Sequence, residues 1–227
     1  MFEDLKNNID FFIRNKTQFS RKNFIEKDLK KIEYNNLENL YIEDILSQCF
    51  TIRENQESLR ILDIGAKNWF YAKGEYKFFN QISKNIIMDG VELDAYRLYS
   101  NFYSRYEVAK YYIKDLNGVN YIIGNLLDIQ NKYDYITWFL PFVAKEPHIF
   151  WGLPKKYFYP EKLVLHAYTL LKDNGKMLII NQGENEAEIQ KNLLEKLKIP
   201  YLELGKIESE YLKYKYNRFG FLVRSNN

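Results

Sequence analysis

Residues 59–65 read Leu-Arg-Ile-Leu-Asp-Ile-Gly, a short apolar run that ends in an acid and a glycine. Ile61, Leu62 and Ile64 suit a buried strand, and Gly65 permits the tight turn that must follow it. Nucleotide-binding α/β domains begin their first strand-to-helix turn in this way. The stretch therefore predicts the first strand of such a domain.

Downstream of this stretch, apolar strand-like runs alternate with helical patterns. We expect strands at 59–64, 86–93, 119–123, 133–139, 175–181, 200–205 and 218–224, and helices at 72–84, 95–110, 160–172 and 185–197. Such alternation is typical of a parallel sheet with helices on both faces. The short polar connection between the last two runs favours an antiparallel pair over another crossover helix. The sequence predicts a Rossmann-like α/β fold, with a mostly parallel seven-stranded sheet and a C-terminal antiparallel strand.

Residues 1–56 read as an N-terminal helical cap on a main domain at 57–227. Apolar residues recur at helical spacing in three segments, which carry Leu5, Ile9, Phe12 and Ile13, then Phe24, Ile25, Leu29 and Ile32, then Leu37, Leu40, Tyr41, Ile45 and Leu46. That spacing places each set on one helix face. The basic residues of the second segment are interpreted as a solvated helix surface.

Bulk composition limits the classes of function. The chain has 227 residues, of which 46% are hydrophobic, so we expect a globular protein. A net charge of +3 is too small to argue for a nucleic-acid partner. The single cysteine, Cys49, excludes a disulfide within the chain and a cysteine-based zinc site. The N-terminus lacks an apolar signal core and no apolar stretch reaches the length of a membrane span, so the expected location is the cytoplasm.

Polar residues follow the first four predicted strands. They belong to residues 63–68 (Asp-Ile-Gly-Ala-Lys-Asn), 91–94 (Val-Glu-Leu-Asp), 124–128 (Gly-Asn-Leu-Leu-Asp) and 133–138 (Tyr-Asp-Tyr-Ile-Thr-Trp), and a Lys-Asp-Asn-Gly turn comes later at 172–175. Right-handed crossovers bring the carboxyl ends of parallel strands to one edge of the sheet. Because ligands bind at that edge, we expect these residues to form a binding site.

This ordered set resembles the class I S-adenosylmethionine-dependent methyltransferases, from residue 57 to the C-terminus. The resemblance implies that the turn after the first strand wraps the methionine part of the cofactor, and that an acid after the second strand accepts hydrogen bonds from the ribose hydroxyls. It also implies a polar residue after the third strand that meets the adenine amine. The corresponding residues are Asp63, Gly65, Ala66 and the backbone of Lys67 for methionine, Glu92 (with Asp94 second) for ribose and Asn125 with Leu126 for adenine, while Leu93 and Trp138 complete the expected set.

The first turn departs from two glycine patterns. The G-x-G-x-x-G pattern that binds the pyrophosphate of dinucleotides is absent, which weighs against a nicotinamide or flavin dehydrogenase. Methyltransferases of this class often have a second glycine two residues after the first, and Lys67 stands there. That substitution keeps open a non-catalytic interaction or scaffold protein with the same fold. An RNA methyltransferase using the basic residues of the cap is a further alternative, and a small-molecule acceptor is preferred.

Two specialised classes of methyltransferase are disfavoured by the residues after the fourth strand. Phe139-Leu140-Pro141-Phe142 has the proline and aromatic residue typical of enzymes that methylate exocyclic amines of bases, but it lacks their polar residue. Methylation of a base carbon needs a nucleophilic cysteine, and Cys49 lies in the expected cap.

Residues 140–160 are expected to form a lid over the cofactor site. Four of the five prolines lie here, among many aromatic residues, and proline restricts the backbone. The aromatic residues suit either a wall for an apolar or planar substrate or a packed surface loop. His148 is the candidate general base, on a loop. Methyl transfer often needs little beyond orientation and proximity, so the sequence assigns no other catalytic residue.

Overall fold

The computed structural model describes residues 33–51, 56–99 and 102–225. The chain divides into two units, Met1–Asn36 and Leu37–Asn227. Only the first residues of one helix are described in the first unit. The sheet and all the other helices that the structure describes belong to the second unit.

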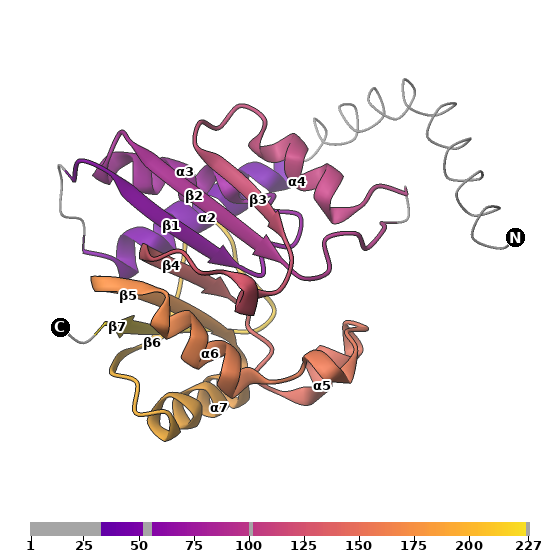
Figure 1. Cartoon of the computed structure of the whole chain (residues 1–227), viewed down its shortest axis with the longest axis vertical. Coiled ribbons are helices and arrows are strands. Elements are labelled where there is room, and N and C mark those ends of the chain that lie inside the picture. The colour runs from indigo at the N-terminus through magenta and orange to yellow at the C-terminus, as the bar shows by residue number, and fades with distance from the viewer. Residues whose placement is uncertain (1–32, 52–55, 100–101, 226–227) are drawn as a thin grey trace, which may run out of the picture. The chain divides into compact units, whose positions relative to one another are not determined.

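Seven strands form one sheet in the order β3-β2-β1-β4-β5-β7-β6 (Figure 1). The strands are β1 (Leu59–Ile64), β2 (Ile86–Glu92), β3 (Val119–Ile123), β4 (Tyr133–Phe139), β5 (Leu171–Gln182), β6 (Tyr201–Ile207) and β7 (Arg218–Arg224). Strands β1 to β5 pair in parallel, and β7 is antiparallel to β5 and β6. The predicted fold class is thereby confirmed. Strand order reverses between β1 and β4, which is where ligands bind in sheets of this kind.

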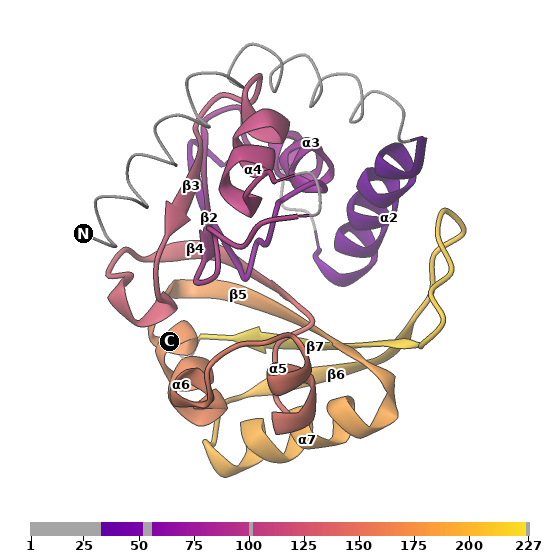
Figure 2. The same ribbon diagram turned by 90° about the vertical axis from the view of Figure 1, so that its right-hand side faces the viewer.

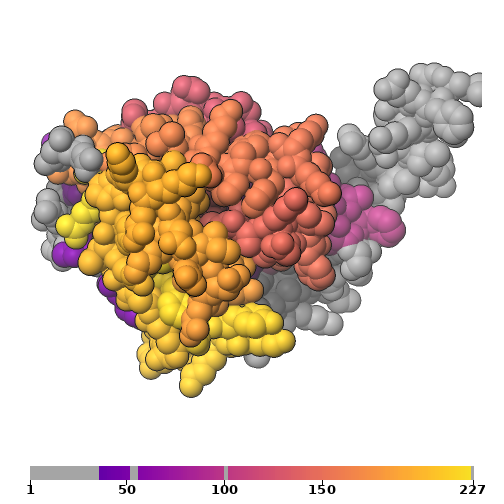
Figure 3. All heavy atoms as spheres, turned by 90° about the horizontal axis from the view of Figure 1, so that it is seen from below, coloured from indigo at the N-terminus to yellow at the C-terminus, as the bar shows by residue number. Residues whose placement is uncertain are grey.

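Helices cover both faces of the sheet (Figure 2). One face carries α2 (Glu33–Cys49), α3 (Ala72–Ile82) and α4 (Arg105–Ile113), and the other carries α6 (Pro160–Thr169) and α7 (Gly183–Lys196). Between β4 and α6 lie the short helix α5 (Lys145–Phe150) and the 3-10 turn η2 (Lys155–Tyr157), and a second 3-10 turn, η1 (Leu126–Asp128), follows β3. In the view of Figure 3, α7 (gold) lies beside the α5–α6 segment (coral to orange) on one face of the molecule.

The two faces of the sheet bury separate hydrophobic cores. Neighbouring residues of one strand point to opposite faces, so Ile61 enters the core with α2 and α3 while Leu62 enters the core with α6 and α7. Helix α2 contributes Ile45 and Leu46, both fully buried, to the first core. Residues 37–49 of α2 therefore pack in one core with the sheet. The first two expected helical segments lie outside the described residues, and a separate cap at 1–56 stays a prediction.

Helix α4 begins at Arg105 rather than at the expected residue 95. Ser104 caps it: its side chain accepts a hydrogen bond from the backbone of Glu107, and the Glu107 side chain accepts one from the backbone of Ser104. This reciprocal arrangement fixes a helix start. The Ser-x-x-Glu spacing is visible in the sequence and could have placed the boundary.

Strand β5 begins at Leu171, four residues before the expected start at 175. The Lys-Asp-Asn-Gly turn is therefore an irregularity inside the strand, where the pairing with β4 shifts register. Asn174 has a left-handed φ of 62°, and Lys172 Nζ lies 2.7 Å from the Asp134 carboxylate of β4. The ion pair holds the bulged residues against β4. Helix α6 ends at Thr169, two residues before the strand begins.

Candidate functional site

The turn after β1 has an unusual backbone that other residues hold in place. Gly65 has a φ of 75°, and Lys67 and Trp69 also lie in the left-handed region, at 55° and 44°. This conformation costs a non-glycine residue about 1 kcal/mol or more. The backbone N–H of Lys67 donates to Glu92 Oε2 at 2.9 Å, and its carbonyl accepts a hydrogen bond from the Tyr121 hydroxyl. These two bonds fix the turn although lysine replaces the expected glycine.

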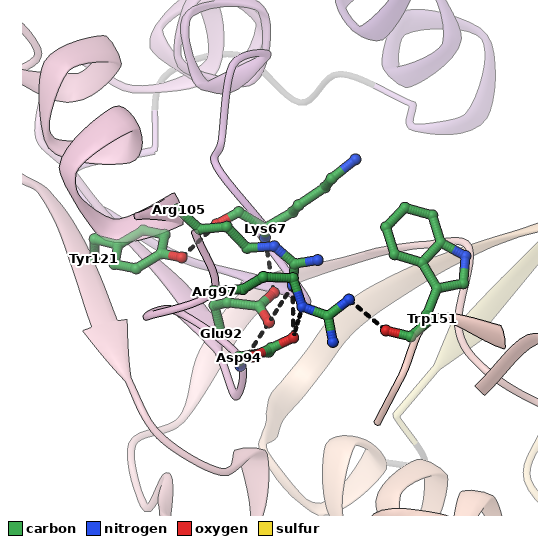
Figure 4. A network of polar contacts seen from close by, with 7 residues as sticks. All are labelled: Lys67, Glu92, Asp94, Arg97, Arg105, Tyr121 and Trp151. Carbon is green, nitrogen blue, oxygen red and sulfur yellow. Dashed lines mark hydrogen bonds and ion pairs between the residues drawn. The ribbon is translucent and has the colours of Figure 1, made fainter. Parts of the chain in front are cut away.

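Glu92, at the end of β2, is the centre of a polar network (Figure 4). Its Oε1 atom accepts from the Asp94 backbone N–H at 2.7 Å and from Arg105 Nη1 at 3.3 Å. The Arg97 guanidinium forms an ion pair with Asp94 at 2.6 Å. A carboxylate offers about four acceptor positions, and together with Lys67 N–H three donors occupy Glu92. The side chain can therefore accept a further hydrogen bond.

Lys67 extends its side chain away from these carboxylates (Figure 4). Its Nζ atom lies 4.8 Å from the ring centroid of Trp151, and the Arg105 guanidinium lies 5.9 Å from the same ring. Burial and the nearby positive charge of Arg105 lower the pKa of Lys67. The carboxyl edge of the sheet thus carries a partly desolvated cation beside an aromatic ring from residues 140–160.

A buried pair of carboxyl groups lies beneath the turn. Asp63 Oδ2 accepts a hydrogen bond from the Tyr71 hydroxyl at 2.8 Å, and Glu75 Oε2 accepts one from Trp69 Nε1 at 2.8 Å. Thr137 Oγ1 lies 3.3 Å from Asp63 and 2.8 Å from Glu75. Burial and the Glu75 charge raise the pKa of Asp63 well above its usual range, and burial raises the pKa of Glu75 to about 7.

Asp63 and Glu75 are both fully buried. Asp63 therefore supports the turn from beneath. The Asp63 carboxyl reaches the turn through Tyr71, and Glu75 reaches it through the left-handed Trp69. Sequence reasoning missed Glu75 and Trp69, and it placed Thr137 at this edge without its contacts to the two acids. A glutamate within a predicted helix gives no sequence signal that its side chain points into the sheet.

Asn125 and Leu126 follow β3 at the same edge. Asn125 Oδ1 accepts a hydrogen bond from the Leu127 backbone N–H at 3.1 Å and so caps η1. Its Nδ2 atom donates to the Tyr159 hydroxyl at 2.7 Å. Leu126 is buried, whereas Leu93 after β2 is 38% exposed.

The remaining expected site residues, which are Ala66, Trp138 and His148, are all buried. Ala66 is fully buried, and Trp138 is buried near the end of β4. His148 lies within helix α5 and not on the expected loop. Its side chain is 3% exposed, with Nε2 3.1 Å from the Pro154 carbonyl. Because it packs inside its own segment, His148 faces no open space from which it could act as a base.

Glycines leave room along the carboxyl edge. Gly65, Gly124 and Gly183 follow β1, β3 and β5, and a Cβ atom added at any of the three would meet no described atom within 4 Å. A ligand can therefore approach the backbone closely beside β1 and β3. Within the described residues, no group of three or more His, Cys, Asp or Glu side chains could hold a metal ion. None of the described helices combines the length and apolarity that a membrane crossing requires.

Solved structures share the fold of this chain. An S-adenosylmethionine-dependent methyltransferase from Aquifex aeolicus matches with a TM-score of 0.58 over 88% of this chain and 97% of its own, at 16% identity. The chain has the class I methyltransferase fold. Magnesium protoporphyrin IX methyltransferase from Synechocystis, solved with bound S-adenosylmethionine, matches at a TM-score of 0.50 and 13% identity over 96% of both chains.

Precorrin-6y C5,15-methyltransferase from Geobacter metallireducens has the same fold, with a TM-score of 0.53 and 11% identity over 83% of this chain and 87% of its own. No protein-family model matches the sequence, and neither does any curated protein. At identities this low the likeness concerns the fold alone, so the function of this chain must be argued from its own residues.

Proposed function

We propose that the protein is an S-adenosylmethionine-dependent methyltransferase that acts on a small-molecule acceptor. The observation that carries the proposal is the bond between Lys67 N–H and Glu92 Oε2, which joins the turn after β1 to the acid after β2 beside the reversal of strand order. Open space next to Gly65 and Gly124 supports a ligand at this point. The shared fold is consistent with this function but does not by itself establish it.

The residues at this edge fit the parts of the cofactor. The free acceptor position of Glu92 suits a ribose hydroxyl, and Asn125 with the buried Leu126 suits adenine. The turn at Gly65, Ala66 and Lys67 would hold the methionine part, with Leu93 and Trp138 at its borders. The bound cofactor would supply an electrophilic methyl group on a sulfonium cation, and the carboxylate-bearing edge suits that positive charge better than it suits a pyrophosphate.

The chain's own contribution to methyl transfer would be orientation and exclusion of water. An in-line displacement at an activated methyl group needs the acceptor held close and aligned. Residues 140–160 lie between the fourth strand and α6 and can cover the acceptor. The weak net charge of +3 and the pairing of Arg97 and Arg105 with acids favour a small molecule over the backbone of RNA.

The Glu92→Gln variant tests the assignment of the ribose site. Adenosine and 2′,3′-dideoxyadenosine differ only in the ribose hydroxyls, so their affinities by calorimetry isolate that contact. The wild-type protein should prefer adenosine by about tenfold to a hundredfold, since a hydrogen bond to a charged acceptor contributes roughly 1.5–3 kcal/mol. In Glu92→Gln the preference should shrink to within about threefold, because the charge is lost.

Asp89→Asn provides the matched control, because Asp89 is a buried acid of the same strand that accepts from Arg60, Asn120 and Tyr133. Its variant should keep the wild-type preference for adenosine. Equal affinity of the wild-type protein for the two nucleosides would refute the ribose assignment. A loss of both affinities together in Glu92→Gln would show that Glu92 only holds the turn.

A non-catalytic protein with the same fold is the second candidate. The observation that favours it is the left-handed Lys67 and Trp69, which stand where a glycine-rich turn would leave more room for a ligand. Such a protein would bind neither S-adenosylmethionine nor its demethylated product. Binding measurements therefore separate the two candidates directly.

A further inference from the structure

The segment between β4 and α6 is a small folded unit with its own core. The His148 ring lies 5.7 Å from the Phe142 ring and 5.3 Å from the Phe158 ring, in edge-on contacts. The bond between His148 Nε2 and the Pro154 carbonyl ties α5 to the turn that follows it. Residues 142–158 are therefore held together internally, and we call residues 140–160 the lid.

Trp151 makes the first contact between the lid and the carboxyl edge of the sheet. The Trp151 carbonyl accepts a hydrogen bond from Arg97 Nη1, as Figure 4 shows. The Nζ atom of Lys67 and the guanidinium of Arg105 both lie over the Trp151 ring. Each cation–aromatic contact of this kind contributes about 0.5–2 kcal/mol. Trp151 thus rests on residues that border the acid at the end of β2.

The second contact is the hydrogen bond from Asn125 Nδ2 to the Tyr159 hydroxyl, at 2.7 Å. Asn125 Oδ1 is already committed to the Leu127 backbone. The Tyr159 hydroxyl therefore occupies the amide donor of Asn125, which could otherwise donate a hydrogen bond to a ring nitrogen of adenine. The two contacts lie at the ends of β2 and β3, so the lid meets the site on its ribose side and on its adenine side.

We infer that the closed lid and the cofactor compete for the ends of β2 and β3, so that binding displaces the lid. The inference rests on the proposed function, because it takes the ends of β2 and β3 as the nucleoside site. A ligand that binds only the open form shows an affinity reduced by the fraction of open molecules. Weakening a lid contact should then tighten ligand binding, although it removes a contact from the protein.

The Tyr159→Phe variant tests the inference with S-adenosylhomocysteine as the ligand in calorimetry. Loss of one hydroxyl frees Asn125, and the dissociation constant should fall by about threefold to tenfold. Trp151→Ala should act in the same direction, because it frees Lys67 and Arg105. The control is Tyr157→Phe, which removes a hydroxyl of the same lid at a residue whose ring contacts Lys156, and it should leave the dissociation constant unchanged.

Hydrogen exchange supplies a second readout that does not depend on a variant. Addition of S-adenosylhomocysteine to the wild-type protein should raise exchange in residues 142–158 and lower it in the turn at residues 65–68. Lower exchange in both segments, or weaker binding by Tyr159→Phe and Trp151→Ala, would overturn the competition while leaving the proposed function intact. Absence of binding in the wild-type protein, Tyr159→Phe and Trp151→Ala would overturn the competition and the proposed function together. Binding by the two variants but not by the wild-type protein would support the competition and the proposed function.

Discussion

Glu75 and Asp63 place two carboxyl groups in the fully buried floor of the first turn. The Thr137 hydroxyl lies within hydrogen-bond distance of both carboxyls, and two negative charges in one buried site are strongly unfavourable. Burial therefore favours the protonated form of both carboxyls. The turn that carries Lys67 is supported by a group whose charge state depends on pH.

The pH dependence of stability should show this pair. The folded-state pKa of each acid lies above its unfolded value, so the neutral form is favoured by folding. The stabilisation is fully present below the unfolded pKa and is lost as pH rises through the folded pKa. Urea unfolding should show a decline in the free energy of unfolding between about pH 4.5 and pH 7 for the wild-type protein, and a flatter profile for Glu75→Gln. Glu188→Gln, at an exposed glutamate of α7, should retain the decline; an unchanged profile in Glu75→Gln would contradict the assignment.

Gln190 is another buried polar residue, on the inner face of α7. It is fully buried, and neither its amide nitrogen nor its amide oxygen has a hydrogen-bond partner within the part of the chain that the structure describes. A buried unsatisfied polar group costs roughly 1–3 kcal/mol. Gln190→Met keeps the shape and should raise the free energy of unfolding by about 1–2 kcal/mol.

Urea denaturation of Gln190→Met beside Gln81→Met checks this expectation. Gln81 is exposed on α3 and bonds Glu43, so its substitution should change stability by less than about 0.5 kcal/mol. A loss of stability in Gln190→Met would show that the amide is satisfied in solution.

At the scale of elements, what could be predicted from the sequence depended on whether the signal was local. The run at 59–65 marked β1 because apolar residues and a glycine are adjacent there. The Ser104–Glu107 capping box was equally local, yet the apolar spacing before it suggested an earlier helix. The lid was expected from its prolines, but its contacts could not be, since Tyr159 and Asn125 are 34 residues apart.

The same contrast between local signals and contacts of distant residues applies to the site. The positions of Glu92 and Asn125 at one edge of the sheet could be predicted because the carboxyl ends of parallel strands meet there. The contact between Glu75 and Thr137 could not, because it arises from packing between α3 and β4. His148 was expected to be available as a base, but the rings of its own segment enclose it.

For the whole molecule, the fold class followed from the alternation of strands and helices and is shown by the structure. The step from fold to activity depends on whether the edge beside Gly65, Glu92 and Asn125 binds a sulfonium nucleoside. Its network of Lys67, Glu92 and Arg105 is pre-formed, and the lid rests on it. S-adenosylmethionine should therefore bind measurably to the intact protein, with the lid contacts setting its affinity.

Thermal unfolding with and without S-adenosylmethionine is the most direct test of this claim. A ligand that binds the folded protein stabilises it by about 2.7 kcal/mol at 100 times its dissociation constant, so the midpoint should rise with ligand concentration. The demethylated product should act in the same way. An unchanged midpoint at millimolar concentrations of both ligands would contradict the account.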